Sequence, residues 1–195
     1  MTLISALSNV HEKGQFGDHE GKNEKNLIKL TEKKNLLIVQ IVQYKNSSIK
    51  IENLKIDNLY FKNEVLNISA NKDTRIIWNS PNNWLLFSSK HELLKEILDN
   101  FDEKNFAITD ISHSRAIIEL EGKNVKEVLK KGCHFNFNDL RKNNSLNSTF
   151  NGIAVTIDML KEDPYKVRIL TLRSFGESLY HSISDSCLEY GYKSI

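Results

Sequence analysis

The stretch LLIVQIVQY, residues 36–44, restricts more than any other feature how this chain can fold. It is a near-continuous run of branched apolar residues, has the length of a strand, and follows the polar residues 1–34. Such a run is typical of a strand buried within a sheet. The chain therefore needs partner strands for this segment, and the rest of the sequence has to supply them.

Two later segments have the pattern of β-hairpins. RIIW (75–78) and WLLF (84–87) flank NSPNN, whose proline and asparagines favour a turn. Residues 155–159 alternate between apolar and polar, and after Glu-Asp-Pro the chain returns as YKVRILTL (165–172). The alternation predicts that Asp158 points away from the core.

Three segments have the periodicity of amphipathic helices. Asn124 and Glu127 have the spacing of a capping box, and Gly132 predicts the end of that helix. SSIKIENLKIDNLYF (47–61) stays open between a helix and a strand. The predicted apolar faces are Leu94, Ile97, Leu98 and Phe101 in the first helix, Val125, Val128 and Leu129 in the second, and Phe175, Leu179, Ile183 and Cys187 in the third.

The order strand, helix, strand, proline turn, strand, helix occurs in both halves of the chain. It predicts an α+β fold of two pseudo-repeated split β-α-β lobes packed together, about 35–103 and 104–195, in a single domain over 35–195. Residues 1–34 are polar and contain Gly14, Gly17 and Gly21. They are expected to form an extended arm that is loose alone or orders on a partner.

TDISHSR, residues 109–115, places two serines, a histidine, an aspartate and an arginine between two apolar segments. A Ser-His-Asp set is the obvious catalytic interpretation. In an extended strand, however, Asp110, Ser112 and Ser114 point to one face while His113 and Arg115 point to the other, and no glycine elbow adjoins either serine. We therefore expect these side chains to satisfy backbone groups where a strand bends between lobes, or to face a partner.

Charge and cysteine content exclude several classes of protein. The 195 residues carry a net charge of +2, and their lysines are dispersed along the chain. The sequence therefore has no basic stripe of the kind that binds nucleic acid. Cys133 and Cys187 lack zinc-site spacing and favour free, buried thiols in a reducing compartment. The sequence has no phosphate loop, and the chain is expected to bind no flavin, NAD or metal itself. It has no signal peptide or membrane span, so we expect it to be cytoplasmic and to have no membrane partner.

Three blocks of this sequence occur together, in this order, in one known family: RIIWNSPNNWLLF, TDISHSRAIIELEGKNVKEVLKKGCHFNFNDL and LRSFGESLYHSI. On these blocks the chain resembles the gamma subunit of heterotetrameric sarcosine oxidase. The matching positions are Trp78, Pro81, Trp84, Leu85, Asp110, Ser112, His113, Ser114, Arg115, Gly122, Lys131, Gly132, Cys133, Asp139, Arg173, Ser174 and Phe175.

The resemblance implies the fold of the folate-binding domain of aminomethyltransferase (T-protein). It also implies a non-catalytic chain in a complex with alpha, beta and delta subunits, which oxidises sarcosine to glycine and forms 5,10-methylenetetrahydrofolate and hydrogen peroxide. FAD, FMN, NAD, zinc and tetrahydrofolate would belong to the other subunits. Catalytic, cofactor and metal residues are then expected to be absent from this chain. The structural or partner-facing candidates are Trp78, Trp84, Asp110, Ser112, His113, Ser114, Arg115, Arg173 and Phe175.

Two alternatives stay open. The chain could be the similar small subunit of a related heterotetramer, such as N-methylglutamate dehydrogenase. The second alternative is a free-standing folate-binding protein of the aminomethyltransferase type. Tetrahydrofolate binding by an isolated monomer would favour the latter.

Overall fold

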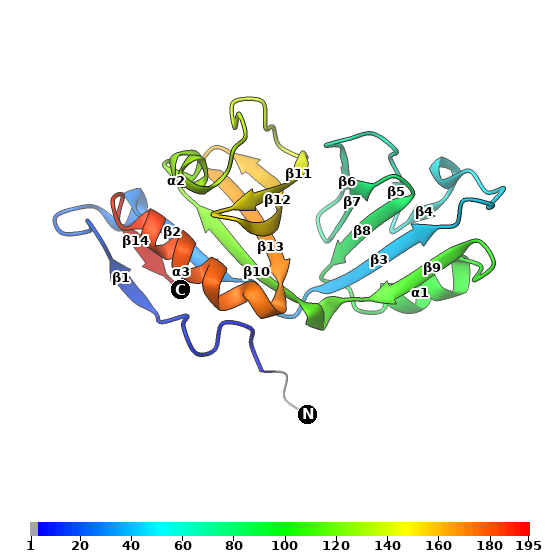
Figure 1. Cartoon of the computed structure of the whole chain (residues 1–195), viewed down its shortest axis with the longest axis horizontal. Coiled ribbons are helices and arrows are strands. Elements are labelled where there is room, and N and C mark those ends of the chain that lie inside the picture. Colours follow the sequence, from blue (N-terminus) through cyan, green and yellow to red (C-terminus); the bar gives the residue numbers. More distant parts are fainter. Residues whose placement is uncertain (1–3) are drawn as a thin grey trace. The chain divides into compact units, whose positions relative to one another are not determined.

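The computed structural model describes residues 4–195, and the chain forms two compact α+β units (Figure 1). Unit 1 comprises the segment that ends at Lys34, Ser114–Lys142 and Leu146–Ile195, and unit 2 comprises Asn35–His113 and Asn143–Ser145. The chain therefore passes from unit 2 to unit 1 between His113 and Ser114, not near residue 103 as the sequence predicted. Helix and strand patterns in a sequence do not indicate which sheet a strand joins. The sheet that each strand joins sets the boundary between the two units.

Unit 1 is built on a seven-stranded sheet with two α-helices. Both helices, α2 (Val125–Gly132) and α3 (Gly176–Cys187), contact β13 and one another (Figure 1). The strand order across the sheet is β1 (Gly14–Phe16), β14 (Tyr192–Ser194), β2 (Ile28–Glu32), β10 (Arg115–Glu121), β13 (Tyr165–Leu172), β12 (Ile153–Glu162) and β11 (Ser145–Phe150).

The segment predicted as an arm contributes two strands to this sheet. β2 pairs in parallel with β14 and antiparallel with β10, after a short 3₁₀ turn η1 (Glu24–Asn26). Leu27, Ile28 and Leu30 are buried, as is Leu7 near the start of the chain. The polar average of residues 1–34 conceals these apolar positions, so the part after Glu24 belongs to the folded unit rather than to an arm.

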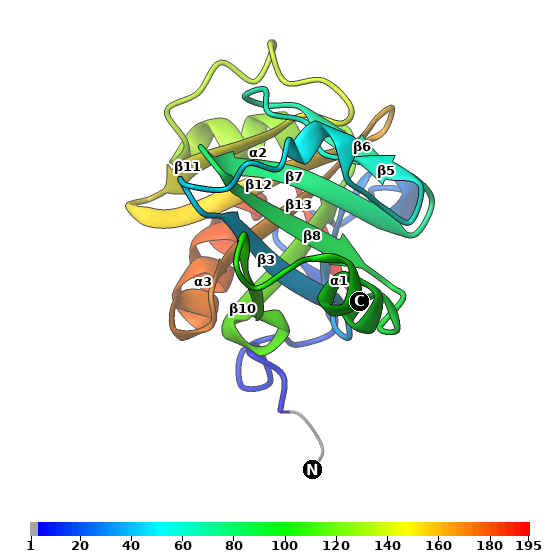
Figure 2. The ribbon, with the colours of Figure 1, turned by 90° about the vertical axis from the view of Figure 1, so that its right-hand side faces the viewer.

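Unit 2 is built on a five-stranded sheet whose neighbours β7, β8 and β3 run side by side in Figure 2. Its strand order is β6 (Ile68–Ala70), β7 (Thr74–Ser80), β8 (Asn83–Ser88), β3 (Leu37–Gln43) and β9 (Phe106–Asp110), and α1 (Leu93–Asn100) packs on β9. The predicted first strand and the first hairpin are therefore confirmed.

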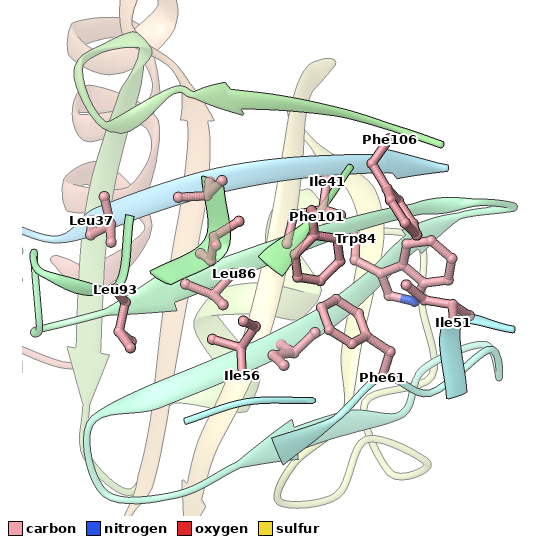
Figure 3. Packing of buried hydrophobic residues seen from close by; sticks show 13 residues of the cluster. Leu37, Ile41, Ile51, Ile56, Phe61, Trp84, Leu86, Leu93, Phe101 and Phe106 are labelled. Atoms are coloured by element: carbon pink, nitrogen blue, oxygen red, sulfur yellow. The ribbon is translucent and has the colours of Figure 1, made fainter. Parts of the chain in front are cut away.

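An aromatic cluster fills the core of unit 2 (Figure 3). The ring of Phe61 lies edge-on to Trp84 at 5.8 Å and to Phe101 at 5.7 Å, and Phe101 meets Phe106 at 4.9 Å. Trp84 is fully buried and its Nε1–H donates to the Lys62 carbonyl at 2.8 Å. This donor bond removes the cost of burying the indole N–H.

Residues 47–61, ambiguous in sequence, form a 3₁₀ turn η2 (Ile51–Asn53) and a hairpin of β4 (Lys55–Ile56) and β5 (Leu59–Tyr60). Asp57 and Asn58 both have positive φ, 49° and 61°, as a tight hairpin turn requires. Thus no α-helix lies between β3 and β6, and the described part of unit 2 lacks the helix that a split β-α-β repeat needs there.

The three predicted helices form, but three details of their prediction are wrong. Leu98 is 56% exposed and Leu93 is buried in its place, because the helix turns its other edge to the sheet. The capping box does not form, since Asn124 makes no cap bond and Glu127 accepts from Lys130 at 2.7 Å. Phe175 lies outside α3, in the 3₁₀ turn η4 (Arg173–Phe175).

Gly132 ends α2, but its role is packing. A side-chain carbon at this position would lie 2.8 Å from the ring of Phe150. The glycine therefore lets the helix approach β11 closely.

Candidate functional site

The predicted strand through TDISHSR is broken by a 3₁₀ turn, η3 (Ser112–Ser114), between the end of β9 and the start of β10. The extended geometry expected from sequence is therefore wrong at these residues. The Ser112 hydroxyl accepts the Ile38 N–H at 2.9 Å and donates to the Asp110 carboxylate at 2.5 Å. Asp110 also accepts the Ser112 N–H at 2.9 Å, so these side chains satisfy backbone groups where β9 ends.

His113 is exposed, and its ring has no hydrogen-bond or ionic partner within residues 4–195. The carboxylate of Asp110 is bonded to Ser112 instead of orienting the imidazole. Ser114, also exposed, closes η3. A base held by a carboxylate and aimed at a serine is what Ser-His-Asp chemistry requires, and these residues do not form it.

Arg115 begins β10 half-buried, directly opposite Leu172 on β13. Burial lowers the pKa of its guanidinium. No carboxylate or carbonyl within the described residues pairs with this side chain. Arg115 thus carries a partly desolvated charge that residues 4–195 leave uncompensated.

Arg173 and Phe175 lie in η4, immediately after β13. The Nη2 of Arg173 donates to the carbonyl of Ile4 at 2.5 Å. The side chains around it are apolar and open to solvent: Phe175 is 48% exposed, Leu172 47% and Ile4 73%. Sequence periodicity had assigned Phe175 to the core-facing stripe of the last helix, and the structure corrects that assignment.

The two tryptophans of the first hairpin differ in environment. Trp84 belongs to the core of unit 2. Trp78, its cross-strand partner, is half-buried, and its Nε1–H is enclosed without an acceptor among residues 4–195. Trp84 is therefore structural.

The thiols are protonated at neutral pH. Burial raises the pKa of Cys133 to about 11 and that of Cys187 to about 12. A nucleophilic or metal-binding thiol needs the opposite shift. Within residues 4–195 no group of three or more His, Cys, Asp or Glu side chains could hold a metal ion.

Asp158, predicted to point outward, is completely buried. It is the register partner of Arg168, which is in turn opposite Glu119, so three adjacent strands carry an acid–base–acid row. Arg168 Nη2 and Nε lie 2.8 and 3.0 Å from one Glu119 oxygen. Burial alone would raise the pKa of Glu119, but the charge and hydrogen bonds of Arg168, with help from Lys166, lower it overall.

A second buried polar group ties the beginning of the chain to β2. Ser5 donates to the Glu32 carboxylate, and His11 Nδ1 lies 3.9 Å from its other oxygen. The His11 ring meets Tyr180 of α3 edge-on at 5.6 Å. Burial lowers the pKa of His11, partly opposed by Glu32. Sequence gave no signal for this group, because its members come from separate segments.

Comparison with known proteins agrees with this fold. Heterotetrameric sarcosine oxidase from Corynebacterium sp. U-96, solved with pyrrole 2-carboxylate, contains a chain that superposes with a TM-score of 0.81 and 19% identity, over 96% of this chain and 95% of that one. Glycine cleavage system aminomethyltransferase T from Bartonella henselae gives a TM-score of 0.57 and 11% identity, over 84% of this chain and 47% of that one.

Among curated proteins, the sarcosine oxidase subunit gamma of Corynebacterium sp. (strain U-96) is 25% identical over 120 residues. The aligned region spans 60% of this chain and 58% of that relative. None of the helices in the described residues is long and apolar enough to cross a membrane.

The fold defines a class: it is an α+β fold similar to that of aminomethyltransferase T, and the aligned region spans about half of that protein's length. Within this class, residues 59–189 match the sarcosine oxidase, gamma subunit family. The chain belongs to that family. The matched range includes both Trp78 and Trp84, the whole of TDISHSR and the Arg-Ser-Phe turn.

Proposed function

We propose that this chain is a non-catalytic gamma subunit of a heterotetrameric sarcosine oxidase. The match of residues 59–189 to the gamma subunit family carries the proposal. The exposed, unoriented His113 and the buried, protonated cysteines support a chain without its own catalytic group. Its contribution is then to assembly, through side chains that a partner subunit contacts.

The complex would oxidise sarcosine to glycine, consume oxygen and release hydrogen peroxide, with the methyl carbon passed to tetrahydrofolate as 5,10-methylenetetrahydrofolate. FAD, FMN, NAD, zinc and tetrahydrofolate would be held by the alpha, beta and delta subunits, in the cytoplasm. Both cysteines are free and buried, as expected for a protein in a reducing compartment.

Co-expression with the neighbouring genes tests this function. The chain alone is expected to lack a flavin absorbance band and to give no sarcosine-dependent peroxide. The co-purified complex is expected to be yellow and to release peroxide from sarcosine. A flavin bound near stoichiometrically to the isolated chain would contradict the non-catalytic role.

The same preparations separate the alternatives. A complex that turns over N-methylglutamate with an added electron acceptor, and releases no peroxide, would indicate the dehydrogenase. A monodisperse monomer that binds tetrahydrofolate would indicate a free-standing folate-binding protein. Peroxide release from sarcosine by the co-expressed complex, with no tetrahydrofolate binding by the isolated chain, supports the oxidase subunit.

We also propose that the two units share a distant internal repeat, limited to a hairpin followed by an amphipathic helix. β7, β8 and α1 form this arrangement in unit 2, and β12, β13 and α3 form it in unit 1. In both units the buried face of the helix includes apolar residues four positions apart, Leu93 and Ile97 in one and Leu179 and Ile183 in the other.

A further inference from the structure

One end of the unit 1 sheet carries exposed apolar side chains together with two arginines. Leu172 ends β13 and Phe175 ends η4, and Ile4 is linked to the same turn through the bond from Arg173 to its carbonyl. We call Ile4, Leu172, Phe175, Arg115 and Arg173 the η4 surface. It combines an exposed aromatic ring and exposed aliphatic side chains with two guanidinium groups, and aromatic residues and arginine are enriched at protein interfaces.

These residues are held together by the fold. Arg115 and Leu172 are register partners, so their side chains lie on the same face of the sheet. Phe175 immediately precedes Gly176, where an added side-chain carbon would meet Ala116, Leu7 and Ala6 within 3.6 Å. The amino-terminal segment therefore packs against the start of α3, beside η4. In Figure 1 its blue trace runs beneath α3.

The charges of this surface lack counterparts in the described chain. Arg173 donates to a neutral carbonyl, and neither arginine forms an ion pair within residues 4–195. Burial already lowers the pKa of Arg115, so part of its desolvation cost is met before any partner arrives. A carboxylate delivered by another chain would compensate a guanidinium in this setting, with two parallel hydrogen bonds available.

We infer that the η4 surface is where another subunit of the heterotetramer docks, through a segment that presents a carboxylate flanked by apolar side chains. Phe175 and Leu172 contribute apolar contact area, and Arg115 and Arg173 receive the carboxylate. The inference rests on the proposed function, because it needs a heteromeric partner. Beyond that function, the inference identifies which surface of the chain is buried in the complex and what chemistry the covering segment of the partner has.

Competitive incorporation tests this surface. Tagged wild-type chain and an untagged variant are co-expressed with the other subunits, and their ratio in the purified complex is read by mass spectrometry. Phe175→Ser and Arg115→Met are each expected to fall to about one tenth of the wild-type share or less, as for the loss of an interface hot spot. Raising the salt concentration should weaken wild-type assembly more than assembly of Arg115→Met.

Matched controls use exposed residues elsewhere: Leu98→Ser on α1 of unit 2 and Lys123→Met on unit 1. Both should be incorporated like wild type. The isolated variants should melt at the wild-type temperature, since Phe175 is half exposed and Arg115 has no partner to lose among residues 4–195. Equal incorporation of all four variants would overturn the inference and leave the proposed function intact. If wild-type chain enters no complex, the proposed function itself fails.

Discussion

At the scale of single residues, Ser112 is the side chain of the TDISHSR turn that we expect to contribute most to the free energy of unfolding. Its hydroxyl accepts the Ile38 N–H of β3 and donates to Asp110. Ser112→Ala is expected to lower the free energy of unfolding by about 1–3 kcal/mol, because a partly buried backbone N–H loses its acceptor. Urea unfolding of the purified chain measures this. His113→Ala is the neighbouring control and should unfold like wild type.

Asp57 supplies a residue-scale prediction for pH. Burial alone would raise its pKa, but hydrogen bonds from Lys90, Thr74 and Asn71 overcome this and hold the pKa at about 2, below the ordinary 3.8. Because the folded-state pKa is depressed, the stabilisation is complete above pH 3.8 and is lost as the pH falls toward about 2.

Asp57→Asn isolates this effect, since asparagine also tolerates the positive φ of the turn. Wild type should be the more stable protein at neutral pH, and the difference in unfolding free energy should shrink between pH 4 and pH 2. A difference that stays constant over that range would show that the carboxylate charge contributes nothing.

Residue positions also show the limits of sequence reasoning. Alternation along β12 correctly placed Val155, Ile157 and Met159 in the core. It failed for Asp158, because alternation assigns a residue to a face of the sheet without saying whether that face is covered. An acidic residue in an apolar strand can be buried when an arginine is its cross-strand neighbour, as Arg168 is here.

At the scale of elements, the acid–base–acid row ties β10, β13 and β12 together. Arg168→Met should destabilise the chain by about 3–5 kcal/mol, since it leaves the buried Glu119 carboxylate without its main partner. The double variant Glu119→Leu/Arg168→Met should recover part of this loss, because no charge is then stranded on β10. Chemical denaturation of both variants measures the difference. A double variant no more stable than the single one would show that the unpaired Glu119 carboxylate does not destabilise the chain.

The amino-terminal segment gives the second element-scale prediction. β2 lies between β14 and β10, so its amides should be protected from hydrogen exchange in the isolated chain and in the complex. Residues 4–23 contain only the short strand β1 and should exchange faster when the chain is alone. In the complex their exchange should slow, because the segment orders against a partner. Identical exchange in both states would remove the assembly role of this segment.

At the scale of the whole molecule, the sequence predicted the fold class, both hairpins and all three α-helices, because each has a strong local period. It did not predict how the chain divides. β2, β9 and β10 each join a sheet through partners far away in sequence, and residues 143–145 belong to unit 2 although residues on either side belong to unit 1. Local periodicity contains no information about such pairings. For the same reason the η4 surface, built from segments around residues 4, 115 and 172–175, was recognised only in part.

Whether the chain has a catalytic role in the proposed complex can be tested at His113. An exposed imidazole whose neighbouring carboxylate is bonded elsewhere lacks the partner that would hold a general base in place within this chain. We therefore expect His113→Ala to assemble fully and to keep sarcosine turnover per intact tetramer within about twofold of wild type, whereas a lost general base costs about a hundredfold or more. Turnover must be normalised to tetramer isolated by gel filtration, so that weaker assembly is not counted as slower chemistry. Phe175→Ser is the contrasting variant, with less tetramer but normal turnover in what forms. A hundredfold slower tetramer with His113→Ala would mean that a partner subunit completes a catalytic site around this histidine.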